Sequence, residues 1–456
     1  MKKETLDPDV LKHYRQISNL PFLSKVLERI VAIRLDSQSH PNSEKEQSAY
    51  KKFHSTETAL LKIQNDILLS IDQQKCVLLL LLDLSAAFDT VDHSILLNRL
   101  EKRFGITGSA LKWVLSYFEN RRQQVVVDGV KSEETVLSCN VPQGSVLGPK
   151  FFLDYESPLG EIIRSHGLNA HFYADDTQIY IAFKPKHDAK DALSKLHQCM
   201  SDVRKWMAAN YLKLNDDKSE FLLLGTAKNL KNVSIVSVKV GNCEIERSDS
   251  VRNIGAIFDT HLKMEQQVSQ TCKSAWHRLH QIGKIRPYLS AEETKSVIHA
   301  YVTSKLDQNN SLLLGIPDTQ TSRMQKVQNA AAKMIFRKKK YDHVTPLLKD
   351  LHWLPIQQRI SFKVLLLVYK ALNDSAPSYL TQTLNLYQPR ANLRSAKDSL
   401  SLVIPATKLK TYGDRAFSVG GPLLWNDLPF SLRNCKTTES FKRQLKTHLF
   451  CVAYEQ

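Results

Sequence analysis

The chain has 456 residues, of which 42% are hydrophobic and 24% are charged, a balance typical of folded globular proteins rather than of disordered ones. This length allows about two to four domains, each with its own core. No apolar segment follows Met1, and the longest apolar run, at 77–82, is far too short to cross a bilayer. We therefore expect neither a membrane protein nor a secreted one.

The net charge of +17 is unevenly distributed along the chain. Residues 1–259 contain 34 basic and 33 acidic side chains, whereas residues 260–456 contain 29 and 13. A basic region beside a neutral one favours a polyanionic partner, because neutralising phosphates releases counterions and dominates affinity for nucleic acids. A basic surface that is merely solvated remains the alternative.

The seven cysteines are scattered and form no C-x-x-C pair. This pattern disfavours both a disulfide framework and a zinc ribbon. It is consistent with reduced thiols, and we expect a protein of the nucleus, the cytoplasm or both.

The first half of the chain predicts a mixture of strands and helices. Residues 77–82 form a continuous apolar run, typical of a strand buried on both faces, and the run ends at Asp83. Asp92 is placed to cap a helix that carries leucines at helical spacing. A hairpin is predicted over 124–137, with its turn at 128–129.

A second hairpin is predicted over 168–182, with Asp175 and Asp176 at its tip. Residues 188–209 have the pattern of a helix, and Glu220–Leu224 that of a short strand. Together these segments predict an α+β fold with a strand-dominated centre.

Beyond about residue 260 helical patterns dominate. Ser290 and Glu293 have capping-box spacing at the start of one helix, and further helices are predicted at about 322–336, 356–373 and 438–450. The first of these three ends in four consecutive cations, which the helix dipole favours: Arg337, Lys338, Lys339 and Lys340.

Three carboxylates occupy positions where a charge is costly. Asp83 follows six apolar residues, so its carboxylate lies at the edge of a core. Asp175 and Asp176 are adjacent at a hairpin tip, where like charges repel unless a cation neutralises them. A strand end beside such a tip would form a site suited to Mg²⁺, which prefers carboxylates, water and phosphates. Taken singly, each of these residues is more often a turn or cap residue.

Three motifs that contain or flank these residues resemble, in the same order, the catalytic motifs of the reverse transcriptases of non-LTR (LINE-type) retrotransposons. They are Leu82-Asp83-Leu84-Ser-Ala-Ala-Phe88-Asp89, Val141-Pro-Gln143-Gly144-Ser-Val-Leu-Gly148-Pro149 and Tyr173-Ala-Asp175-Asp176. Segments at 14–21, 48–58, 212–220 and 253–259 resemble other motifs of this family. From there to Phe450 the chain is similar to the C-terminal part of L2- or CR1-type elements.

The resemblance implies a right-hand polymerase, in which fingers and a palm with a central antiparallel sheet precede a mainly helical thumb. We expect a reverse-transcriptase domain at about 10–260, made of an N-terminal and fingers segment at 1–75 and a palm with inserted fingers elements at 76–260. A thumb-like region at 261–340 and a basic C-terminal region at 341–456 would follow. Members of the family commonly carry an endonuclease ahead of the polymerase, and we expect this chain to lack it.

The same resemblance implies the roles of the site residues. Asp83, Asp175 and Asp176 would bind two Mg²⁺ ions, with Mn²⁺ as an alternative, and Leu84 would add its backbone carbonyl. Lys218 would protonate the leaving pyrophosphate.

The nucleotide and template contacts are implied in the same way. Phe88 would lie under the sugar and exclude a 2′-hydroxyl, although an ordinary core aromatic is the alternative. Gln143 and Gly144 would contact the template base and the incoming nucleotide. Three cations are candidates for the triphosphate, with simple solvation as the alternative: Lys51, Arg15 and Lys52. The four cations at 337–340 would touch the nucleic-acid backbone or serve only as a helix-end charge cluster.

The expected activity is RNA-directed DNA synthesis, with template RNA, a DNA primer or target, and dNTPs as partners. The alternative is a catalytically inactive RNA- and DNA-binding protein that keeps only the fold. The intact aspartates and Gln143 favour the enzyme. Lys150 and Asp154 favour the alternative, because the segment from Lys150 to Glu156 falls where the family usually has a nearly unbroken apolar helix. The missing endonuclease favours it too.

Overall fold

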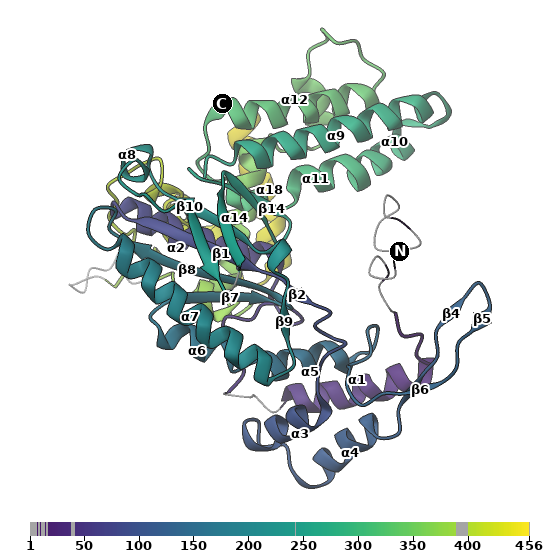
Figure 1. The fold of residues 1–456 in the computed structure, drawn as a ribbon. Helices are drawn as coiled ribbons and strands as arrows, with labels where there is room; N and C mark the ends of the chain where they lie inside the picture. The colour runs from purple at the N-terminus through teal and green to yellow at the C-terminus, as the bar shows by residue number, and fades with distance from the viewer. Residues whose placement is uncertain are drawn as a thin grey trace.

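The structure, a computed structural model, describes residues 7, 10, 14, 17–37, 42–241, 243–388 and 400–455. Its centre is a six-stranded sheet in the order β11-β12-β10-β1-β8-β7 (Figure 1). The strands are, in that order, β11 (Ser237–Val240), β12 (Cys243–Ser248), β10 (Glu220–Leu224), β1 (Cys76–Leu82), β8 (Asp176–Phe183) and β7 (Asn169–Tyr173). The expected antiparallel sheet is confirmed except between β10 and β12, which run parallel.

Strand β1 is the apolar run predicted from the sequence, and all seven of its residues are buried. It pairs antiparallel with β10 on one side and β8 on the other. Because side chains alternate along a strand, Val77, Leu79 and Leu81 enter one hydrophobic core and Leu78 and Leu80 the other. Burying one leucine contributes about 1.5–3 kcal/mol, so β1 anchors both layers of the protein.

The two hydrophobic cores are built from different parts of the chain. One lies between the sheet and α3 (His93–Lys102), α5 (Leu147–Glu156) and α7 (Ala189–Ala209). The other contains α2 (Thr56–Asp72) and, from the C-terminal part, α14 (Ile356–Leu372), α16 (Phe417–Asn426) and α18 (Thr438–Tyr454). The second core therefore runs without a break across residue 260, where a subdivision of the chain was predicted.

Other elements extend from this centre. In Figure 1 the helices α9, α10 and α12 lie at one end of the molecule, and α1, α3, α4 and the β4–β5 hairpin lie at the other. The remaining helices are α1 (Phe22–Ser37), α4 (Gly108–Phe118), α6 (Leu159–Ser165), α8 (Ala227–Leu230), α9 (Glu265–Ile285), α10 (Ala291–Ile298), α11 (Ser304–Asp307), α12 (Asp318–Ile335), α13 (Thr345–Asp350), α15 (Ser378–Thr381) and α17 (Phe430–Arg433). The remaining strands are β2 (Leu84–Ser85), β3 (Arg122–Gln123), β4 (Val126–Val127), β5 (Val130–Lys131), β6 (Thr135–Val136), β9 (Lys213–Leu214), β13 (Ser250–Asn253) and β14 (Ala256–Asp259).

Several local predictions are confirmed. Asp92 caps α3 by accepting a hydrogen bond from the backbone of Ile95, and Ser290 and Glu293 form the capping box of α10. The β4–β5 hairpin turns at residues 128–129. Helix α12 begins at Asp318, four residues earlier than predicted.

No helix in the described part of the chain is long and apolar enough to cross a membrane. All seven cysteines are free in the structure.

Candidate active site

The first catalytic candidate, Asp83, lies where β1 ends and β2 begins. The last residue pair between β1 and β8 is Leu82 with Thr177, so the next step of this register brings Asp83 opposite Asp176. Facing residues in antiparallel strands are about 4.5–5.5 Å apart at their Cα atoms. The sheet register therefore places these two carboxylates side by side.

Asp175 lies in the turn of the β7–β8 hairpin. Tyr173 pairs with Asp176 across the hairpin, so the turn consists of Ala174 and Asp175, and Ala174 has a positive φ of 56°. The prediction that Asp176 also lies at the tip is wrong, because Asp176 is the first residue of β8. This register is what turns Asp176 toward Asp83.

Electrostatics confirm that the three carboxylates interact. Burial, together with the charges of Asp175 and Asp83, raises the pKa of Asp176 from 3.8 to about 6. Burial and the charge of Asp175 also raise the pKa of Glu156, at the end of α5, well above its usual range. The negative charges around the β7–β8 turn are therefore only partly balanced by nearby positive groups.

Lys218 contacts the first of these carboxylates. Its Nζ lies 2.9 Å from Oδ2 of Asp83, and the side-chain amide of Asn215 donates to the same oxygen at 3.1 Å. The backbone N–H of Asn215 also donates to the carbonyl of Asp83 at 2.8 Å. The candidate general acid is therefore held at the carboxylate cluster.

The fit of the site to a divalent cation can be judged from these contacts. Within the described residues, no group of three or more His, Cys, Asp or Glu side chains is arranged as a ready-made metal site. At Asp83, Oδ2 accepts hydrogen bonds from Lys218 and Asn215. The oxygens of closely spaced carboxylates, such as those that raise the pKa of Asp176, are the ligands that hard divalent cations prefer. The carboxylates of Asp83, Asp175 and Asp176 are therefore of a chemical type that fits such an ion.

Leu84, the candidate backbone ligand, is the first residue of β2, and its side chain is buried opposite Leu214 of β9. Phe88 follows this strand and is half-buried, with its ring stacked on Phe152 at 4.9 Å. The carbonyl of Phe88 accepts a hydrogen bond of 2.9 Å from the backbone of Val141. The first two predicted motifs are therefore joined directly by their backbones.

Gln143 and Gly144 lie in the turn before α5, where Gln143 is half-buried and Gly144 is exposed. Gly144 has φ +105°, and a Cβ there would lie 3.1 Å from the carbonyl oxygen of Ser18, so the position suits only glycine. The backbone N–H of Ser18 donates to the carbonyl of Gln143 at 2.7 Å. The buried carboxylate of Glu28 in α1 accepts the N–H groups of Val146 and Leu147 at 2.7 and 3.0 Å. The N-terminal segment thus holds this loop.

The three candidate triphosphate ligands differ in their surroundings. The Nζ of Lys51 donates to the carbonyl of Glu44 at 2.6 Å, and burial lowers its pKa, so its ammonium already has a partner inside the fingers segment. Lys52 is exposed, with its ammonium 4.7 Å from the ring centre of Phe53. Arg15 lies outside the described residues.

The cation run at 337–340 follows α12 and is exposed along its whole length. Arg337 donates to the carbonyl of Pro287 at 3.4 Å, and Lys333 donates to the carbonyl of Lys340 at 2.5 Å. These two hydrogen bonds hold the backbone at Lys340 and Pro287. The exposed side chains of 337–340 form a concentrated positive charge on the surface.

Sequence reasoning missed three buried polar residues around the site. The side chain of Gln47 bonds both backbone groups of Ala174, Glu28 caps α5, and Glu156 lies beneath the hairpin. Only Glu156 gave a signal in the sequence, as an acidic residue in a helix expected to be apolar. Burial raises the pKa of this carboxyl well above its usual range, which favours its neutral form.

Comparison with known proteins agrees with this geometry. The family model described as "Reverse transcriptase (RNA-dependent DNA polymerase)" matches residues 1–258, the part that carries all three aspartates. The chain belongs to the reverse transcriptase family.

Two relatives of this reverse transcriptase come from Drosophila melanogaster. A probable RNA-directed DNA polymerase from transposon X-element is 26% identical over 360 residues, covering 74% of this chain and 37% of that protein. The RNA-directed DNA polymerase from mobile element jockey is 30% identical over 270 residues, covering 58% of this chain and 28% of that protein. The chain therefore spans well under half the length of these relatives. Among solved structures, a telomerase from Candida tropicalis is 11% identical with a TM-score of 0.43, covering 93% of this chain and 57% of that chain.

Proposed function

We propose that this reverse transcriptase extends a DNA 3′-hydroxyl with dNTPs on an RNA template, using Mg²⁺ at Asp83, Asp175 and Asp176. The observation that carries this proposal is the meeting of three carboxylates from two distant segments at one end of the β1–β8 pair. Their mutual repulsion, expressed in the pKa of Asp176, supports a site built for bound cations. Polymerases that transfer nucleotides commonly use a pair of divalent metal ions.

The residues around this site would have different catalytic roles. Asp83, Asp175 and Asp176, with the carbonyl of Leu84, would hold two Mg²⁺ ions. Bound there, the ions would activate the attacking 3′-hydroxyl and stabilise the charge on the leaving pyrophosphate. Lys218, released from Asp83, would give its proton to the pyrophosphate oxygen.

The neighbouring loops would select and position the nucleotide. The Phe88 ring, held against Phe152, would lie under the deoxyribose. The turn at Gln143 and Gly144 would let backbone approach the template base and the incoming nucleotide closely.

The basic C-terminal part would hold template RNA and target DNA. Helix α9 exposes a stripe in which an aromatic side chain lies among basic ones and no acidic residue intervenes: Lys273, Trp276, His277, His280 and Lys284. Cations that neutralise phosphates, interleaved with aromatics on which bases stack, are typical of nucleic-acid-binding surfaces. The exposed run at 337–340 supports the same assignment.

Primer extension tests the proposal. The protein is incubated with a DNA primer on an RNA template, dNTPs and Mg²⁺, beside Asp175→Ala/Asp176→Ala. The matched control is Glu133→Ala/Glu134→Ala, which also removes two adjacent acids, but from an exposed hairpin. Extension by the parent and the control, but not by the aspartate variant, is the expected result.

No extension by a parent that is folded and binds the primer–template would overturn the proposal. The protein would then be an inactive nucleic-acid-binding member of the family. Extension by Asp175→Ala/Asp176→Ala would place the activity outside the proposed site.

A further inference from the structure

The hairpin that carries Asp175 is held from outside the sheet by residues 44–48, here called the clasp. Strand β7 is the end strand of the six-stranded sheet, and the clasp pairs with its outer edge. The backbone N–H of Phe172 donates to the carbonyl of Glu46 at 3.0 Å, and that of Ser48 donates to the carbonyl of Phe172 at 2.9 Å. The clasp thereby covers an edge that would otherwise be open.

Gln47 reaches from the clasp to the turn itself. Its side-chain N–H donates to the carbonyl of Ala174 at 3.2 Å, and its side-chain oxygen accepts the N–H of Ala174 at 3.0 Å. The Gln47 side chain is only 3% exposed, and Ala174 has the left-handed backbone that a tight turn requires. Both backbone groups of the residue before Asp175 therefore depend on one glutamine.

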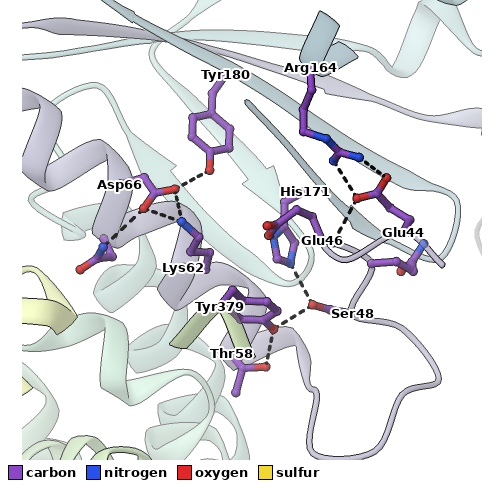
Figure 2. Close-up of polar contacts among 12 residues, drawn as sticks. Glu44, Glu46, Ser48, Thr58, Lys62, Asp66, Arg164, His171, Tyr180 and Tyr379 are labelled. Atoms are coloured by element: carbon purple, nitrogen blue, oxygen red, sulfur yellow. Dashed lines mark hydrogen bonds and ion pairs between the residues drawn. The ribbon is translucent and has the colours of Figure 1, made fainter. Parts of the chain in front are cut away.

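The two ends of the clasp are anchored to different parts of the protein. At its start, the guanidinium of Arg164 in α6 donates to both oxygens of Glu44 at 2.8 Å. At its end, the hydroxyl oxygen of Ser48 lies 2.9 Å from Nε2 of His171 in β7 and 2.8 Å from the hydroxyl of Tyr379 in α15. Figure 2 shows the Tyr379 hydroxyl between Ser48 and Thr58. The C-terminal region thus reaches the catalytic hairpin through Ser48.

A serine, a histidine and a glutamate in succession also resemble a hydrolytic triad, since Glu46 lies 3.5 Å from the far ring nitrogen of His171. Ser48 is 1% exposed and His171 is fully buried, and the Tyr379 hydroxyl already occupies the other side of the serine oxygen. A nucleophile must reach its substrate, so this group cannot act as one. Burial raises the pKa of Tyr379 to about 12, which keeps its hydroxyl protonated as a hydrogen-bonding group.

We propose that Gln47 and Tyr379 are positioning residues of the polymerase site: Gln47 fixes the turn that carries Asp175, and Tyr379 of the C-terminal region fixes the clasp that carries Gln47. This inference rests on the proposed polymerase function. Buried hydrogen bonds such as those of the Gln47 amide and the Tyr379 hydroxyl favour one arrangement of the groups they join. The C-terminal helices, whose sequence lies beyond the part that matches the family model, thereby contribute to the geometry of the carboxylates.

Two substitutions test the inference, each with a control of the same chemistry. Tyr379→Phe removes the hydroxyl from the clasp; Tyr369→Phe removes the hydroxyl of another buried tyrosine, which donates to the carbonyl of Cys435 at 2.9 Å. Gln47→Met removes the two bonds to Ala174 and a third bond, which the Gln47 side-chain oxygen accepts from the backbone N–H of Ala49 at 2.9 Å. Gln328→Met removes a buried amide that donates to the carbonyl of Leu354 at 2.8 Å. Both controls lie away from the hairpin.

The first readout is amide hydrogen exchange of residues 172–176 in the full-length protein, which needs no activity. Exchange at these amides should rise about tenfold in Tyr379→Phe and more in Gln47→Met, because local opening becomes easier. The second readout is the maximal rate of single-nucleotide incorporation, which should fall about tenfold or more, since misplaced catalytic groups slow the chemical step. The Kd for primer–template should not change, and both controls should match the parent.

Unchanged amide hydrogen exchange of the hairpin in Gln47→Met and Tyr379→Phe would show that the clasp does not hold the hairpin. Raised exchange with a normal incorporation rate would overturn its positioning role. A parent without any extension would instead overturn the proposed function, and the exchange measurement would still decide whether the clasp holds the hairpin.

Discussion

The ammonium of Lys218 lies 2.9 Å from Oδ2 of Asp83, the oxygen that also accepts the Asn215 amide. The lysine therefore supplies a positive charge at one carboxylate of the cluster. The side chain of Lys218 is 64% exposed, so the pair is strongly screened by solvent and can be broken at little cost. We expect a divalent ion bound at the same oxygen to compete with this ammonium.

Lys218→Met should therefore have opposite effects on metal binding and on catalysis. Affinity for Mn²⁺, measured by electron paramagnetic resonance without nucleic acid, should rise, because Asp83 no longer has a competing cation. The incorporation rate should fall about 10²-fold if the lysine is the general acid. Lys213→Met, at an exposed lysine of β9, should change neither quantity. A variant with unchanged metal affinity would contradict the competition.

The raised pKa of Asp176 predicts how stability depends on pH. Because its folded-state pKa is about 6 against 3.8, the group stabilises the metal-free protein at low pH and loses that contribution as pH rises from about 4 to about 6. Asp176→Asn should consequently gain about 1 kcal/mol relative to the parent between pH 4 and pH 7, after solvent screening. Urea denaturation at both pH values measures this, and Mg²⁺ at pH 7 should reduce the gain. A constant difference would contradict the repulsion.

Glu156→Gln tests whether the buried glutamate is neutral. Burial raises its pKa well above the usual range, so its favourable contribution is present at low pH and is lost as pH rises. The unfolding free energies of variant and parent should agree within about 1 kcal/mol at pH 5, because an amide replaces a protonated carboxyl of the same shape. At pH 8 the variant should be the more stable protein. Parallel pH profiles would show that Glu156 is ionised in the fold.

Phe88→Val tests the aromatic ring as a barrier to ribonucleotides. The substitution shortens a side chain that stacks on Phe152 and leaves the backbone bond to Val141 intact. Discrimination between dNTP and rNTP, measured as the ratio of kcat/KM, should fall about tenfold or more. An unchanged ratio would identify Phe88 as an ordinary core aromatic.

The basic run after α12 predicts a change in salt dependence. Lys338→Ala/Lys339→Ala/Lys340→Ala should weaken primer–template binding and reduce the slope of log K against log salt by about 0.9 for each phosphate that these lysines neutralise. Lys184→Ala/Lys186→Ala/Lys190→Ala removes three exposed lysines from the neutral half of the chain and should leave the slope unchanged. Equal effects of the two variants would indicate a general charge effect only.

The features that the sequence predicted are those with local causes. A run of apolar residues is enough to identify β1, and caps such as Asp92 on α3 act within one helical turn. The hairpin of β7 and β8 was predicted, but the place of Asp176 in it was not, because one step of register decides which residues form the turn. A resemblance of motifs supplied the roles of the aspartates.

The features that it missed depend on contacts between distant residues. Gln47 and Ala174 are 127 positions apart, and Ser48 and Tyr379 are 331 apart, so no spacing along the chain relates them. The partner of Lys51 was missed for another reason, because a lysine near a basic motif has the same sequence pattern whether it meets phosphate or a carbonyl such as that of Glu44.

The hydrophobic core that α2 and β1 share with the C-terminal helices has a practical meaning for anyone who wishes to produce this protein. A gene cut at residue 258, where the family match ends, would leave Ile63 and Ile67 of α2 without the side chains of Val364, Phe417 and Leu445 that belong to the same core. Bare apolar surface of this kind drives aggregation. We therefore expect a soluble product only when the helices up to α18 are kept in the same chain.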